Sequence, residues 1–126
     1  MRFLASSFVE GTLLRGKSIE QFLGGSNANS HRTIRWIEIR PDGGKLEIWV
    51  FESPDIGSAD FLDLYEFDGD AGPEHPVHTC QSALEALEYA HTHLGASRDR
   101  WVNQFVIQSE YEDYIARGRP TIWPWR

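Results

Sequence analysis

TIRWIEIRPDGGKLEIWVFE, residues 33–52, is the stretch that decides the fold, because two runs of alternating side chains flank a glycine-containing turn. Asp42-Gly43 is a favoured pair at the centre of a tight hairpin turn. Pairing outward from such a turn sets Trp36 opposite Trp49. The stretch therefore predicts an antiparallel β-hairpin whose register is marked by that tryptophan pair.

The two faces of this hairpin have different chemistry. One face is aliphatic and is predicted to form core; it carries Ile37, Ile39, Leu46 and Ile48. The other face carries both tryptophans and sets Glu38 opposite Glu47, a like-charge pair that disfavours full burial. We therefore expect the second face to be only partly covered, either by the C-terminal segment TIWPWR or by a partner.

Working outward, capping residues, turn residues and periodicity predict the remaining elements. Strands and helices that are segregated along the chain indicate an α+β fold. We expect one domain over residues 1–126, with an antiparallel sheet packed on one face by helices. The expected elements are strands at 2–9 and 60–67, helices at 19–23, 83–94 and 109–117, and loops at 24–30 and 68–80.

Composition limits the class of protein. With 126 residues and 40% apolar side chains, the chain can bury a core but has no apolar run of the roughly 20 residues that span a bilayer. Its first residues lack the apolar stretch of a signal peptide. The single cysteine, Cys80, cannot form an internal disulfide, which is typical of a reducing compartment. We expect a cytoplasmic protein.

Charge is distributed very unevenly. No lysine or arginine lies between Lys45 and Arg98, whereas that interval holds eleven carboxylates. The whole chain has a net charge of −7. Such a balance disfavours nucleic acid and anionic membranes as partners. Instead it favours a basic protein, because complementary charge steers association and selects partners.

Several histidines and the single cysteine are candidate metal ligands. His75, His78 and Cys80 are close in sequence, but their spacing matches no common zinc motif. His91 and His93 point in different directions on a helix, and His91 is better explained as a core residue with a hydrogen bond. No catalytic motif is present, so we expect neither an enzyme nor a bound metal or cofactor. The alternative is a small metal-dependent or hydrolytic enzyme that uses His75, His78, Cys80 and nearby carboxylates.

The predicted binding site is the acidic segment at residues 52–74. Its loop carboxylates can reach a partner without disturbing the core, and tryptophans are enriched at binding hot spots. The predicted partner-binding residues are Asp55, Asp60, Asp63, Glu66, Asp68, Asp70, Glu74, Trp36 and Trp49. A regulatory subunit of another complex would show the same features.

In type, the chain resembles the immunity proteins of bacterial contact-dependent growth inhibition and related polymorphic toxin systems. The resemblance rests on FLDLYEFDGD, IRWIEIRPDGGKLEIWVFE and SALEALEYAHTHL, within an acidic chain that lacks catalytic motifs. It implies a cytoplasmic antidote that binds the C-terminal toxin domain of a cognate effector, often a nuclease, and covers its basic active-site cleft. No motif aligns position by position, so the resemblance implies no residue roles.

Overall fold

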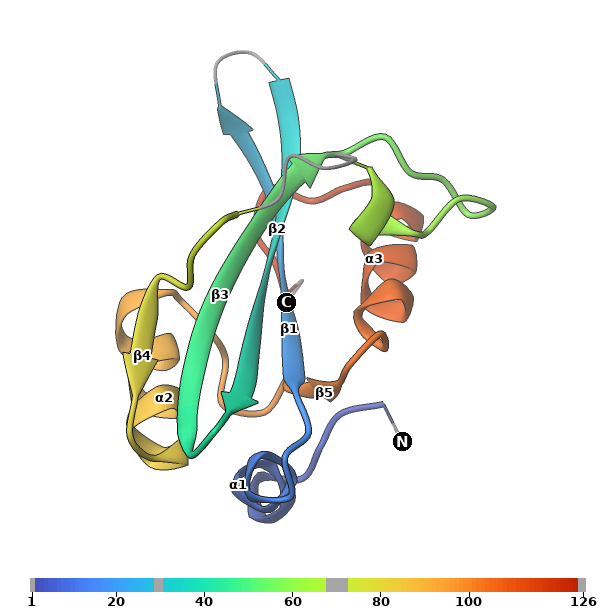
Figure 1. Ribbon diagram of the computed structural model, residues 1–126. Coiled ribbons are helices and arrows are strands. Elements are labelled where there is room, and N and C mark those ends of the chain that lie inside the picture. Colours follow the sequence, from blue (N-terminus) through green and yellow to red (C-terminus); the bar gives the residue numbers. More distant parts are fainter. Residues whose placement is uncertain (1, 29–30, 68–72, 125–126) are drawn as a thin grey trace.

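The computed structural model describes residues 2–28, 31–67 and 73–124 (Figure 1). Within these ranges the chain forms helices and strands in an α+β arrangement, which confirms the predicted fold class. In chain order they are α1 (Ser6–Leu14), β1 (Ile19–Ala28), β2 (His31–Asp42), β3 (Lys45–Pro54), the 3-10 helix η1 (Leu64–Glu66), β4 (His78–Cys80), α2 (Ala83–His93), β5 (Val102–Asn103) and α3 (Ile107–Ala116).

The strands form one antiparallel sheet in the order β4-β3-β2-β1-β5. Helices cover both faces of this sheet, rather than the single face expected from the sequence (Figure 1). Ile37 and Ile39 of β2 belong to the same core cluster as residues of α1 and α2. Ile34 and Trp36 point the other way and pack with α3 and η1. Both faces of β2 carry apolar side chains, so helices must pack on both sides of the sheet to bury them.

The hairpin forms where it was predicted but in a different register. Asp42 pairs with Lys45, and Trp36 lies opposite Phe51 rather than Trp49. The turn is centred on Gly43 and Gly44, with φ values of 56° and 87°. A tight turn of this kind needs positive φ at both central positions, which two glycines adopt without the penalty that Asp42 would meet. The pairing therefore shifts by two residues, and each side chain keeps its predicted face.

Three expectations for short segments were wrong. In the segment 2–9, residues 6–9 begin helix α1 and Phe3 forms only an isolated bridge; in the segment 60–67, the regular element is η1 and Phe61 forms only an isolated bridge. The segment read as a helix at 19–23 and a loop at 24–30 is strand β1 where the structure describes it. Its side chains alternate between the two core clusters, because pairing with β2 outweighs a weak local capping signal.

The longer helices agree better with the prediction. In α2 the backbone N–H of Glu85 donates to the Ser82 hydroxyl at 3.2 Å, which is the predicted cap. Helix α3 begins at Ile107, slightly before the predicted start, and has no side-chain cap. Gly118, with a φ of 81°, follows its last turn as expected.

Helix α3 packs closely on β1 because β1 has a glycine at the contact. A Cβ atom on Gly25 would lie 2.0 Å from the hydroxyl oxygen of Tyr114. Phe22 on the same strand contacts Tyr114 and Trp123, with ring centroids 5.4 Å and 6.0 Å away. The described part of the C-terminal segment therefore packs over Phe22.

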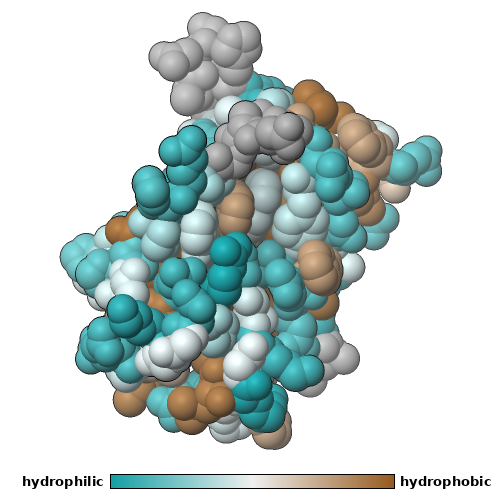
Figure 2. Space-filling view, viewed as in Figure 1, coloured by the Kyte–Doolittle hydropathy of each residue, from teal (hydrophilic) through white to brown (hydrophobic). Residues whose placement is uncertain are grey.

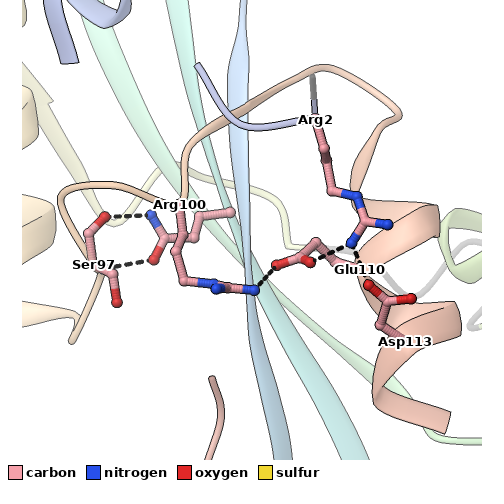
Figure 3. A network of polar contacts seen from close by, with 6 residues as sticks. Arg2, Ser97, Arg100, Glu110 and Asp113 are labelled. Carbon is pink, nitrogen blue, oxygen red and sulfur yellow. Dashed lines mark hydrogen bonds and ion pairs between the residues drawn. The ribbon is translucent and has the colours of Figure 1, made fainter. Parts of the chain in front are cut away.

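A polar network joins the N-terminal segment to α3 (Figure 3). Glu110 is 1% exposed and accepts hydrogen bonds from Arg2 and Arg100, each at 2.8 Å. Beside it, Gln21 and Ser97 exchange two hydrogen bonds between strand and loop (Figure 3). The two arginines compensate the burial of the Glu110 carboxylate.

Across the described ranges, none of the helices combines the length and apolar character that a membrane crossing needs.

Candidate functional site

Four of the predicted binding carboxylates are exposed. Asp60, Asp63 and Glu66 lie along the connection that contains η1, and Glu74 lies shortly before β4. Asp68 and Asp70 lie outside the described residues. In the space-filling view, hydrophilic and hydrophobic residues stand side by side over the loop that follows β3 (Figure 2). In the described part of this acidic segment the exposed large hydrophobic side chains are Ile56 and Phe61, and Val77 is exposed just after it.

Asp55 has a structural role instead of the predicted surface role. Its side chain is 1% exposed and forms an ion pair with Arg119 at 2.9 Å. The Tyr111 hydroxyl donates to its other oxygen at 2.6 Å and itself accepts from the Gly57 N–H at 2.9 Å. These contacts fasten the loop after β3 to α3. Asp55 is therefore removed from the residues that we expect to reach a partner.

The two hairpin tryptophans also differ from the expectation. Trp36 is 3% exposed, stacks on Phe51 at 5.2 Å and meets the edge of Tyr65 at 5.8 Å. Its ring is therefore covered by Phe51 and by η1, and the C-terminal segment does not cover it. Trp49 is half-buried under the guanidinium of Arg40, at 4.4 Å from the ring centroid. Trp101, by contrast, is fully buried.

Three of the candidate metal ligands, His78, Cys80 and His91, have other surroundings, and His75 is exposed. His78 stacks on Tyr89 at 4.0 Å, and Cys80 is buried on β4, where desolvation raises the pKa of its thiol. The Trp101 indole N–H donates to His91 at 3.1 Å, which is the expected hydrogen bond, but His91 is half-buried and not part of the core; burial lowers the His91 pKa. Among the residues in the described ranges, no three His, Cys, Asp or Glu side chains form a group that could hold a metal ion.

A concave site that contains two buried carboxylates lies elsewhere, between the sheet and η1. It is a pocket of about 270 Å³ whose floor is the face of β1, β2 and β3 that carries Trp36. Glu20 and Glu38 are paired neighbours on β1 and β2 and both line it. Aromatic walls come from Trp36, Phe51, Tyr65 and Phe105. We call this site the Glu20 pocket.

Glu20 and Glu38 are both buried but in different electrostatic settings. Arg40 donates to both oxygens of Glu38, at 2.8 Å and 3.1 Å, in a two-pronged ion pair. Glu20 has only neutral donors: the Tyr65 hydroxyl and the Phe105 N–H both reach its Oε1, each at 2.7 Å. Desolvation by burial outweighs these hydrogen bonds and raises the pKa of Glu20 to about 7. The pocket therefore pairs a carboxylate held by an arginine with one that titrates near neutrality.

Two further polar groups in the pocket lack a protein partner. Trp36 and Ser53 are 3% and 4% exposed, and both line the pocket. The Trp36 indole N–H and the Ser53 hydroxyl form no hydrogen bond to the described residues. Phe105 adds a strained feature, since its φ of 76° is rare for a bulky side chain. Unpaired buried groups and backbone strain are features of binding sites.

Sequence reasoning missed this pocket for an identifiable reason. The residues from Ser18 to Gln21 have the spacing of a helix cap, and this local signal predicts a helix where the structure has the strand that carries Glu20. If the alternation of Ile19, Glu20, Gln21 and Phe22 had been recognised as a strand, a carboxylate would have been expected on the same face as Phe22. Its position opposite Glu38 depends on the pairing of β1 with β2. No local sequence signal reports that pairing.

Comparisons of the chain with protein-family models, with curated proteins and with solved structures gave no match.

Proposed function

We propose that this protein is a non-enzymatic binding protein that docks a basic protein partner through its acidic segment. The observation that carries the proposal is the group of exposed carboxylates Asp60, Asp63, Glu66 and Glu74, in a part of the sequence without lysine or arginine. Exposed apolar side chains, including Phe61 and Ile56, lie within the same segment. Charge for steering combined with apolar contact area is typical of a protein interface.

The connection between β3 and β4 reaches the Glu20 pocket from both of its described parts. Tyr65, next to Glu66, and Pro73, next to Glu74, both line the pocket. The sequence therefore brings two acidic residues of the connection next to residues of this concave surface. A solubilising role would require only dispersed charge.

Within this class we favour an immunity protein of a bacterial toxin system, acting in the cytoplasm on a cognate toxin domain. The support is the resemblance in type described above, together with an α+β domain that presents an acidic surface. A toxin nuclease carries a basic cleft for nucleic acid, and covering that cleft would inhibit it. The same surface would also serve a regulatory subunit, and genetic context separates these two cases.

The test uses the C-terminal domain of a large secreted effector encoded directly upstream of this chain. Co-expression of the chain should restore growth to bacteria that produce that domain. The variant Asp60→Asn/Asp63→Asn/Glu66→Gln should associate about tenfold or more slowly at low salt, and the difference should shrink toward 1 M salt. The matched control is Glu85→Gln/Asp99→Asn/Glu112→Gln, which removes equal charge elsewhere. Equal association rates for both triple variants would overturn the assignment of the docking surface.

A further inference from the structure

We propose that the Glu20 pocket is a binding site for an arginine side chain, presented by the basic partner as the anchor of the complex. The proposal deepens the proposed function and rests on it for the identity of the partner. The ligand chemistry itself is argued from the pocket alone.

The charge of the pocket favours a cation. Glu20, Glu38 and Glu52 line it, and Arg40 is the only lysine or arginine among its described lining residues. Arg40 is already engaged with Glu38. Glu20 has no cationic partner among the described residues, and its Oε2 atom receives no hydrogen bond from them. A positively charged ligand could therefore form an ion pair with the Glu20 carboxylate.

The aromatic walls favour a planar cation over a compact one. A guanidinium stacks on aromatic faces and donates through a fork of N–H groups, whereas an ammonium does neither as well. The chain's own Arg40 demonstrates this mode at the rim of the pocket. Its guanidinium lies 4.4 Å from the centroid of the Trp49 ring while contacting both oxygens of Glu38. The wall formed by Tyr65 and Phe105 offers a second guanidinium an equivalent surface beside Glu20.

The unpaired groups indicate that the ligand also carries a hydrogen-bond acceptor. The Trp36 indole N–H can only donate, and the Ser53 hydroxyl can donate as well. A free guanidinium has no acceptor for either group. An arginine residue within a polypeptide has one, because its backbone carbonyl accompanies the side chain. The pocket thus fits an arginine residue better than a free organic cation.

Proton exchange gives the proposal an additional readout. The charged and titratable groups that face Glu20 are Glu38 and Arg40 from β2, Glu52 from β3 and Tyr65 from η1. Because Glu20 has a pKa of about 7, half of the unliganded molecules carry a proton there at that pH. Binding of a cation favours the ionised form, so it should release protons at pH 7. A neutral ligand would release none by this route.

The experiment titrates the purified protein with Nα-acetyl-arginine methylamide and with the isosteric citrulline compound, which is neutral. The indole N–H resonance of Trp36 and calorimetry in buffers of different ionisation enthalpy are followed at pH 6 and pH 8. We expect the arginine compound to bind about tenfold more tightly than the citrulline compound, more tightly at pH 8 than at pH 6, and with proton release. Equal binding of the two compounds, or binding without a shift at Trp36, would overturn the proposal.

Two variants and a control locate the effect. Glu20→Gln keeps an oxygen for Tyr65 and Phe105 but removes the charge, so it should abolish the pH dependence and weaken binding about tenfold at pH 8. Ser53→Ala should weaken the arginine compound by a smaller factor at both pH values. Glu88→Gln, which is exposed and paired with Arg98 outside the pocket, should leave binding unchanged. Loss of binding in Glu88→Gln equal to that in Glu20→Gln would reveal non-specific attraction and contradict the site.

The failures of the two proposals are distinguishable. If the arginine compound binds but no basic protein partner depends on the exposed carboxylates, the pocket stands and the proposed function falls. If the partner docks and is insensitive to Glu20→Gln, the function stands and the pocket is not its anchor. A neutral compound that binds more tightly than the arginine compound would instead indicate a site for an uncharged ligand, and the proposal would be wrong.

Discussion

At the scale of single residues, three buried glutamates show three ways of placing a carboxylate inside a small protein. Glu110 has two arginines from other parts of the chain, and Glu38 has Arg40 of its own strand. Glu20 has hydrogen-bond donors but no cation among the described residues. Because an uncompensated buried charge is unfavourable, Glu20 is the glutamate whose protonation responds to pH near neutrality.

The stability of the protein should therefore fall as pH rises past the ordinary range of a carboxyl group. Between pH 4.5 and about 7 the folded state keeps a proton on Glu20 that the unfolded state has released. The free energy of unfolding should decrease over this window by up to about 3 kcal/mol, since one pKa unit corresponds to about 1.4 kcal/mol. Urea unfolding at pH 5 and pH 8 measures the decrease, and Glu20→Gln should remove it. Parallel pH profiles for the wild type and this variant would contradict the burial argument, and exposed Glu112→Gln is the control.

Asp55 and Asp60 are close in sequence but should respond very differently to mutation. Asp55→Ala leaves Arg119 and the Tyr111 hydroxyl without their shared acceptor, which should lower the free energy of unfolding by about 3 kcal/mol. Asp60→Ala, on an exposed loop, should change it by less than about 0.5 kcal/mol. Chemical denaturation of the two variants measures both changes in the free energy of unfolding. Similar losses for both would show that Asp55 does not hold the loop.

At the scale of elements, the turn of the hairpin is where local chemistry sets the register. Gly43→Asn creates an Asn-Gly pair, the preferred sequence for a turn with these dihedral angles, so it should be neutral or slightly stabilising. Gly44→Ala places a Cβ in the left-handed region and should destabilise the fold by about 1–2 kcal/mol. Thermal unfolding of both variants is the measurement. A destabilising Gly43→Asn together with a neutral Gly44→Ala would mean that the turn is centred elsewhere.

How well each element could be predicted follows from how local its signals are. The helix at Ala83–His93 has its own cap and spacing, and the faces of the hairpin follow from alternation alone. Strand β1 contains Gly24 and Gly25, poor strand formers, and exists because β2 and α3 pack against it. Residues 60–67 alternate like a strand yet find no partner strand. Pairing between distant segments is the information that one sequence does not display.

The candidate site was predictable only in its exposed part. A charge count locates Asp60, Asp63, Glu66 and Glu74 in the acidic segment, because surface loops place few constraints on their residues. The same charge count also predicts Asp55 to be a surface residue, but its burial depends on contacts with the distant Tyr111 and Arg119. The Glu20 pocket is assembled from β1, β2, β3, η1 and the loop before α3. No continuous stretch of the sequence contains all the residues of this pocket.

At the scale of the whole molecule, the acidic segment should slightly destabilise the isolated protein. Neutralising Asp60, Asp63 and Glu66 removes like charges from a chain of net charge −7 and breaks no buried contact. The melting temperature of this triple variant should equal or exceed that of the wild type at low salt, and the two should converge at 1 M salt. A marked fall in the melting temperature at every salt concentration would show that these carboxylates support the fold.

The network around Arg100 also has a consequence for the order of folding. Its guanidinium lies over Phe3 at 4.5 Å and over Trp123 at 5.7 Å, so one side chain joins segments at opposite ends of the sequence. Contacts so distant along the chain require closure of a very large loop, whereas β2 and β3 meet across two residues. The hairpin is therefore expected to form early and the Arg100 junction late. The N–H of Leu4, beside this junction, donates to the carbonyl oxygen of Trp101. In native-state hydrogen exchange it should lose protection before the amides at the centre of β2, because contacts that form last in folding are expected to open first.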